Sequence, residues 1–166
     1  MDSLVQWFTQ NLSPYISEHA VIFIISLLPI LELRGGLLAA SLLKVPYLQA
    51  LPICVIGNLL PIPFILLFIK QIFKWMKKAK VFRPMIEWLE NKAMKRSDNI
   101  QKGEFWGLVA FVGIPLPGTG AWTGALIASL LGIDVKKSSK AILLGVVIAS
   151  VIMSLVSYVF VGKMVS

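Results

Sequence analysis

The sequence Leu28-Pro-Ile-Leu-Glu-Leu-Arg-Gly-Gly36 places a carboxylate, Glu32, and a guanidinium, Arg34, inside a long apolar stretch. No charged residue occurs in residues 20–31 or 37–43. A charge at the centre of a bilayer costs roughly 2.5–3.5 kcal/mol on insertion scales. The two charges therefore either pair with each other in a break lined by protein, or mark the functional site.

Composition indicates an integral membrane protein. The chain has 166 residues, of which 57% are hydrophobic and only 14% charged, with a mean hydropathy of +0.83. Residues 46–69 and 141–162 are free of charge and long enough to span a bilayer, which takes about 20 residues. The single cysteine, Cys54, lies inside the first of these spans and excludes an intrachain disulfide framework.

Positive charge is concentrated in one connector. Ten of the sixteen Lys and Arg residues fall in residues 70–102: Lys70, Lys74, Lys77, Lys78, Lys80, Arg83, Lys92, Lys95, Arg96 and Lys102. The positive-inside rule places this connector in the cytoplasm. Its apolar residues recur at helical spacing, with two tryptophans as interfacial rings: Phe82, Met85, Ile86, Leu89, Trp75 and Trp88. We expect a basic amphipathic helix on anionic lipid headgroups, and no nucleic-acid partner.

Two further apolar segments are interrupted by helix-breaking residues. Residues 20–43 contain Pro29, Gly35 and Gly36 beside the two charges, and residues 105–131 carry a similar set: Gly113, Pro115, Pro117, Gly118, Thr119, Gly120 and Gly124. Irregular backbone at membrane depth survives only where protein or water surrounds it. We predict that each segment is a re-entrant hairpin. This arrangement also puts the connector on the same face as the loop cations Lys136, Lys137 and Lys140.

A shift of 88 residues aligns parts of the chain with each other. The aligned pairs are residues 40–43 with 128–131, Pro29 with Pro117, Gly36 with Gly124, and Gly57 with Gly145. The match is either an internal repeat or a chance similarity. A repeat would make each half a hairpin followed by a spanning helix, in inverted topology, with a binding site near the midplane.

The predicted fold is an all-α integral membrane protein built from two inverted-topology repeats. A single membrane domain, residues 1–166, would contain an interfacial N-terminal helix (1–17), repeat 1 (18–69), the basic connector (70–103) and repeat 2 (104–162). Two spanning helices and two hairpins are few elements to enclose a transport pathway, so we expect a homo-oligomer.

Two blocks, Pro29–Gly36 and Gly113–Gly124, resemble those of the small multidrug export proteins of prokaryotes. That family is in turn distantly similar to the DedA membrane proteins, which are linked to lipid-carrier translocation. The resemblance implies a multi-pass protein of the prokaryotic inner membrane with a transport role. DedA proteins usually carry arginines in the second hairpin, and this chain has none there. This difference argues against a lipid-phosphate site of the DedA kind.

Glu32 and Arg34 are the first candidates for a substrate or ion site. Partial desolvation would suit Glu32 to proton coupling, and its charge could also meet a cationic substrate. Arg34 would serve as a counter-ion or as a bidentate donor to phosphate or carboxylate. Gly35 and Gly36 would allow a ligand or another chain segment to approach the backbone closely. The structural alternative is that the two charges neutralise each other and pin the hairpin.

The other candidates carry no titratable group. Pro115, Pro117, Gly118, Thr119 and Gly120 form either an unwound loop that offers polar groups to a ligand or a tight, closely packed turn. Trp122 is expected to line a cavity or to anchor the chain at an interface. Asn58 is expected to bind substrate or to join two helices.

Three functions remain open at this level. A secondary transporter or lipid flippase would take a small amphipathic molecule or a lipid headgroup between the hairpins. A lipid-phosphate enzyme would need more charged residues than one Glu and one Arg, and a scaffold would need neither. We expect transport without enzymatic activity, without a cofactor and without a metal site.

Overall fold

The computed structural model of the chain describes residues 2–12, 15–78, 83–95, 100, 103–116 and 118–161. Within these residues every regular element is a helix, which confirms the all-α prediction. The helices are α1 (Asp2–Leu12), α2 (Glu18–Leu27), α3 (Glu32–Leu42), α4 (Tyr47–Leu59), α5 (Ile62–Met76), α6 (Arg83–Met94), α8 (Glu104–Gly113), α9 (Ala121–Leu131), α10 (Val135–Ser154) and the π-helix η1 (Leu155–Val161).

Both interrupted segments form helical hairpins. Helices α2 and α3 are joined by residues 28–31, here called tip 1, and α8 and α9 are joined by residues 114–120, here called tip 2. Each hairpin helix has 10 or 11 residues. At 1.5 Å per residue each is about 15 Å long, or half the thickness of a hydrocarbon core.

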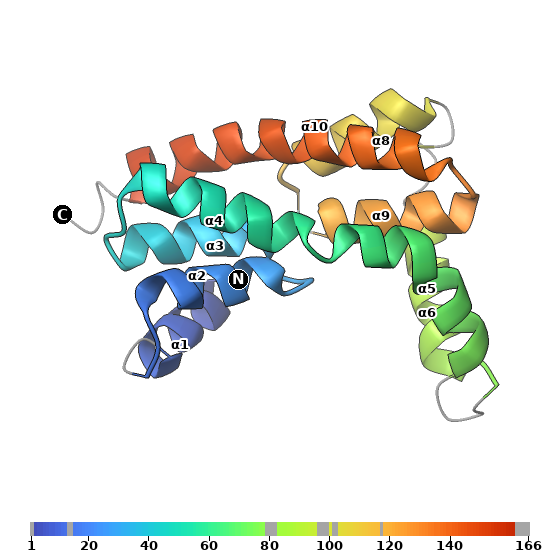
Figure 1. Ribbon diagram of the computed structural model, residues 1–166, viewed down its shortest axis with the longest axis horizontal. Helices are drawn as coiled ribbons and strands as arrows, with labels where there is room; N and C mark the ends of the chain where they lie inside the picture. Colours follow the sequence, from blue (N-terminus) through green and yellow to red (C-terminus); the bar gives the residue numbers. More distant parts are fainter. Residues whose placement is uncertain are drawn as a thin grey trace.

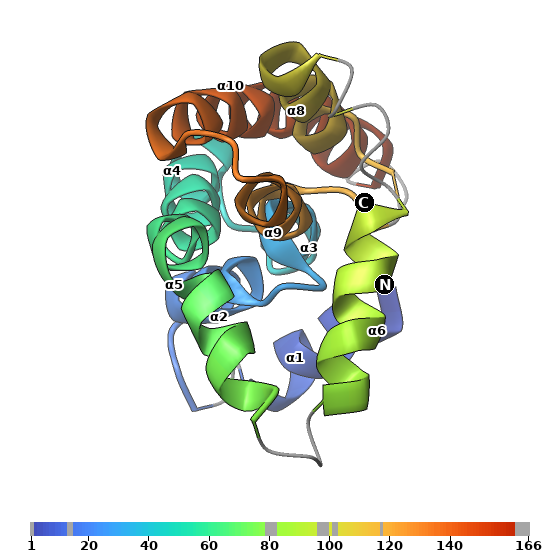
Figure 2. The ribbon, with the colours of Figure 1, turned by 90° about the vertical axis from the view of Figure 1, so that its right-hand side faces the viewer.

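The two hairpins enter from opposite ends of the molecule, and their tips meet in the middle. Figure 1 shows α3 and α9 lying end to end along the long axis, and Figure 2 shows the same pair overlapping at the centre of the bundle. Helix α10 runs beside them for most of the length, while α4 and α5 follow one another on a second side. The tips therefore lie at the level of the middle of the long helices.

Two stretches are long and apolar enough to cross a membrane, residues 47–76 and 135–158. The first differs from the expected uninterrupted helix because it breaks at Leu60 and Pro61, between α4 and α5. Pro61 and Pro63 lack the backbone N–H that would continue the hydrogen-bond ladder. The second, α10, begins at Val135 after Asp134, whose side chain caps the helix by accepting the N–H of Lys137 at 3.0 Å.

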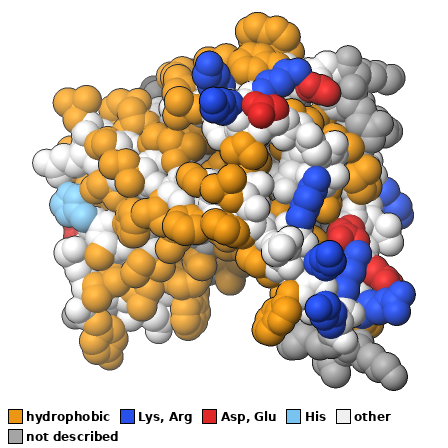
Figure 3. Space-filling model, turned by 45° about the vertical axis from the view of Figure 1, so that its right-hand side comes forward, with side chains coloured by type: hydrophobic (Ala, Val, Ile, Leu, Met, Phe, Trp, Pro, Cys, Tyr) orange, Lys and Arg blue, Asp and Glu red, His pale blue; other side chains and the backbone are white. Residues whose placement is uncertain are grey.

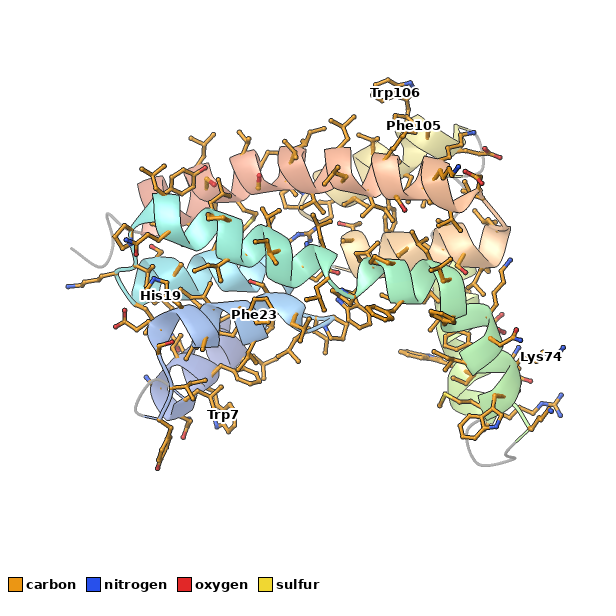
Figure 4. The ribbon with its side chains drawn as sticks, viewed as in Figure 1. Trp7, His19, Phe23, Lys74, Phe105 and Trp106 are labelled. Atoms are coloured by element: carbon orange, nitrogen blue, oxygen red, sulfur yellow. The ribbon has the colours of Figure 1, made fainter. Side chains whose placement is uncertain are left out.

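The charged side chains lie mainly at one end of the molecule. Figure 3 shows Lys and Arg gathered over α5, α6 and the start of α10, while the rest of this face is largely apolar. Figure 4 places Lys74 at this end and His19, which lies within 3.1 Å of Gln49, at the other. An ion pair between Lys137 and Glu104 joins the start of α10 to the start of α8 at the basic end.

The predicted connector helix is present as α6, and part of it is buried. Ile86 is 1% exposed, whereas Trp88 is 57% exposed, and α6 packs against α9 and α5. A salt bridge of 2.6 Å from Lys77 to Glu90 ties α6 to the end of α5. Phe82 and the side chains of Met85 and Leu89, which belong to the predicted apolar stripe, lie outside the described residues.

Candidate functional site

Glu32 forms the first contact between the two tips. Its carboxylate accepts the backbone N–H of Ala121 and that of Trp122, each at 3.1 Å. These are the first two amides of α9, which have no partner inside the helix. A carboxylate at this place is stabilised by hydrogen bonds and by the positive end of the helix dipole. Glu32 is only 5% exposed, so the interaction is shielded from solvent.

The backbone on both sides of this contact is adapted to it. Glu32 itself has φ 50°, which costs a residue other than glycine about 1–2 kcal/mol. Gly120 has φ 137°, and a Cβ there would lie 2.1 Å from Glu32 Oε2. Position 120 therefore accepts only glycine while the carboxylate is in place.

Arg34 forms the second contact. Its Nη1 donates to the carbonyl of Leu116 at 2.6 Å, and its Nη2 donates to Thr119 Oγ1 at 2.9 Å. The same Nη2 lies 3.4 Å from the carbonyl of Ile114, the residue that caps the C-terminus of α8. A cation is favoured beside the negative end of a helix dipole. Arg34 is 6% exposed, and its planar fork reaches several acceptors at once.

The two charges at the start of α3 thus bind on the two sides of the break in the second hairpin. Among the described residues no ion pair joins Glu32 to Arg34. The two charges therefore hold the hairpins through backbone and hydroxyl groups of the second hairpin rather than through a direct salt bridge. The carboxylate binds the start of α9, and the guanidinium binds the loop between α8 and α9, so both contacts link the two hairpins.

Thr119 organises tip 2 from within. Its Oγ1 lies 2.9 Å from the carbonyls of Ile114 and Leu116, and it accepts the N–H of Leu116 at 3.2 Å. Pro115 is half-buried and Gly118 is exposed, in a backbone that is not helical. Pro117 lies outside the described residues. The loop is therefore unwound, as in the first interpretation of its sequence, and internally hydrogen-bonded, as a tight turn would be.

The glycine pair after Arg34 is used for packing. A Cβ at Gly36 would lie 1.9 Å from Ser26 Oγ and 2.9 Å from Cys54 Sγ, so α2, α3 and α4 are in contact there. A Cβ at Gly35 would lie 2.7 Å from Leu31 Cβ. The expectation that these glycines offer backbone to a ligand is not met in this conformation, because side chains fill the space in front of them.

Two candidate side chains hold buried polar atoms without a hydrogen-bond partner. They are Oδ1 of Asn58, a residue that is 2% exposed, and Nε1 of Trp122. Such atoms are uncommon in folded proteins and call for an explanation in terms of water, an ion or a ligand. No group of three His, Cys, Asp or Glu side chains that could hold a metal occurs in the described part of the chain.

A family model described as "Putative small multi-drug export protein" matches residues 32–152, which is most of the chain. The chain belongs to this family. The match confirms the resemblance seen in the two sequence blocks, and together with the two long apolar helices it indicates a membrane protein of an export family. Neither a curated protein nor a solved structure matches the chain.

For this export-family protein, the sequence predicted the two charges and an unwound loop with free polar groups, including Thr119, but not that the charges bind these groups themselves. It did not single out the amide of Ala121 or the carbonyls of Ile114 and Leu116 as their partners. The available signal was the position of these residues directly beside a predicted helix break, where amides and carbonyls lose their helical partners.

Proposed function

We propose that the chain is an ion-coupled secondary transporter for a small amphipathic molecule or a lipid headgroup, with the substrate path between the two hairpin tips. The observation that carries the proposal is the pair of cross-hairpin contacts made by Glu32 and Arg34. Buried ionisable groups at membrane depth are expensive, so they are kept mainly where they serve a substrate or ion pathway. Here they join two separate structural units that can move apart.

Backbone geometry supports an inverted repeat with the 88-residue offset. Glu32 and Gly120, which are 88 positions apart, both have positive φ at the start of the second helix of a hairpin. Lys44 and Gly132, with φ 57° and 75°, are another such pair at the ends of α3 and α9. The following helices, α4 and α10, also begin 88 residues apart.

Glycine packing supports the same repeat. A Cβ on Gly57 would meet the carbonyl oxygen of Phe23 and Cβ of Ser26, each at 3.0 Å. A Cβ on Gly145 would meet the carbonyl oxygen of Val109 at 3.0 Å and Cβ of Val112 at 2.7 Å. Each half of the chain thus packs its long helix on the first helix of its own hairpin through the same kinds of atoms.

In this proposal the long axis of Figure 1 is perpendicular to the membrane, and both hairpins are re-entrant. The end with α6 and the start of α10 would face the cytoplasm, in accord with the positive-inside rule. The cations of residues 70–102 would contact anionic headgroups there. A homo-oligomer would cover the tips, because Ile30 and Leu116 are 71% and 55% exposed beside irregular backbone.

The coupling step follows from the chemistry of Glu32. Protonation removes the negative charge that α9 stabilises and turns one carboxylate oxygen from an acceptor into a donor facing an N–H. The contact between the hairpins is then weakened, and the path between the tips opens to one side. Return of the carboxylate to the amides of Ala121 and Trp122 closes it.

Transport in proteoliposomes tests the proposal. Purified protein would be reconstituted with an imposed proton gradient, and movement of two probes followed: the amphipathic cation ethidium and a fluorescent polyprenyl phosphate. Gradient-dependent movement of either probe supports transport and identifies the substrate class. A protein that moves neither probe in either gradient direction would instead favour the scaffold reading.

A further inference from the structure

We propose that a small monovalent cation of the size of Na⁺ binds at the break between α4 and α5, with Asn58 Oδ1 as one ligand. Its ligand oxygens would come from α4, whereas Glu32 keeps its bonds to the amides of α9 and contributes only its charge. The existence of the site does not depend on the transport proposal.

The first observation is the unpartnered amide oxygen. Asn58 is 2% exposed, and its Oδ1 accepts no hydrogen bond. A buried acceptor without a donor costs about 1–3 kcal/mol. The other buried residues of α4, Ala50, Cys54 and Gly57, lie on the same helical face, which packs against the first hairpin. Asn58 therefore points into the protein at the end of this face.

The second observation is a set of free carbonyls beside it. Pro61 and Pro63 cannot donate to the carbonyls of Gly57 and Leu59, which in a continuous helix would receive their N–H groups. These carbonyls lie at the C-terminal, partly negative end of α4. Leu60 and Pro61 keep αR backbone, so the helix is interrupted without being unwound. The C-terminal end of an interrupted helix near the midplane is a recurrent place to coordinate small cations in membrane proteins.

Helical register places Glu32 near the same depth. Gly36 and Cys54 mark a contact between α3 and α4, and the two helices run in opposite directions in Figure 1. One turn from this contact, towards the tips, lie Glu32 on α3 and Asn58 on α4. The carboxylate adds negative potential to a site whose other groups are neutral oxygens.

The charges around the break limit the ion to a single positive charge. Helices α2, α3, α5 and α10 pack against α4, and their charged residues other than Glu32 and Arg34 lie towards the ends of the molecule: Glu18, Lys70, Lys74, Lys136, Lys137 and Lys140. Arg34 is directed to the carbonyls of tip 2. Calcium sites use six to eight oxygens with several carboxylates, whereas one carboxylate and neutral oxygens suit a monovalent ion.

Position 58 is special to the first half of the chain. The residue 88 positions later is Val146, which is 1% exposed inside the continuous helix α10. An apolar residue thus fills the corresponding place where the helix does not break. The amide is therefore not required by the packing that the two halves share.

Thermal unfolding of the purified protein in detergent tests the site. The Tm would be measured in NaCl, LiCl, KCl and choline chloride at equal ionic strength, with Na⁺ titrated against choline. A bound ion raises the Tm in a saturable manner, and Asn58→Leu should raise the half-saturating concentration about tenfold or more, which corresponds to about 1.4 kcal/mol. Ser138→Ala, which removes another unpartnered buried hydroxyl on α10, should leave the ion response unchanged.

A second variant keeps the test decisive. Asn58→Asp keeps the shape and adds a charge, so it should lower the half-saturating concentration even if Asn58→Leu does not fold. Equal Tm values of the wild type in all four salts would overturn the site and leave water as the partner of Asn58. Because neither measurement involves substrate, loss of this site and failure of transport are separate results.

Discussion

Glu32 and Ala121 are 89 positions apart in the chain, yet the carboxylate of one accepts the N–H of the other at 3.1 Å. The bond joins the tips of two hairpins that enter the molecule from opposite ends. It replaces the internal partner that the first amide of α9 lacks, so a side chain from one half completes the secondary structure of the other.

Gly120→Ala should destabilise the protein strongly. The new Cβ would lie 2.1 Å from Glu32 Oε2, at a backbone φ of 137° that alanine rarely adopts. We expect a loss of about 2–4 kcal/mol, in the range of mutations that combine strain with a broken buried contact. Denaturant unfolding in detergent measures this loss.

Gly103→Ala is the matched control for that variant. A Cβ at Gly103 would come no closer than 3.8 Å to the nearest atom, and its φ of −151° is open to alanine. Gly103 is the N-cap of α8, where alanine is less favourable than glycine, so we expect a loss of about 1 kcal/mol at most, clearly less than at position 120. If the two alanine variants are equally stable, Glu32 does not occupy the start of α9.

Arg34 and Thr119 should be energetically coupled. Thr119→Val removes the oxygen that accepts from Arg34 Nη2 at 2.9 Å, and Arg34→Lys replaces the fork by a single ammonium group. A double-mutant cycle on the free energy of unfolding should give an interaction of about 0.5–3 kcal/mol. Additive effects would show that the two side chains act independently and that the second contact is absent.

Thiol labelling in membrane vesicles should place the ends of each hairpin on one face. In a Cys54→Ser background, single cysteines at His19 and Lys44 should react from outside, and those at Lys95 and Lys136 from the cytoplasm. The ion pair of Lys137 with Glu104 already joins the starts of α10 and α8. Labelling of Lys95 and Lys136 from opposite faces would mean that the second hairpin spans the membrane.

The sequence was sufficient to predict the elements of the site. Pro29, Pro115 and the glycines on either side of Thr119 predict breaks because they disfavour helix. The glycine pair Gly35 and Gly36 was also read as a break, but it lies inside α3. The two charges stand out because so few charged residues occur in apolar segments. These signals are local, and the two helical hairpins follow from them.

The partners of the charges could not be predicted in the same way. Glu32 lies two residues from Arg34, and a local reading favours a pair between them. The structure instead directs each side chain to backbone groups 80 or more positions away. A predicted helix break shows which amides and carbonyls lose their helical partners, but only the arrangement of the hairpins shows which charge binds which of them. The break at Leu60 and Pro61 was also missed, although Pro61 and Pro63 signal it.

The central claim is that Glu32 couples an ion to the movement of the hairpins. The most direct measurement compares wild type, Glu32→Gln and Glu18→Gln in proteoliposomes, following ethidium or polyprenyl-phosphate movement with and without a proton gradient. Glu18 lies at the far end of α2 and serves as the control. We predict that Glu32→Gln abolishes the response to the gradient while Glu18→Gln retains it. Normal gradient-driven movement in Glu32→Gln would contradict the account.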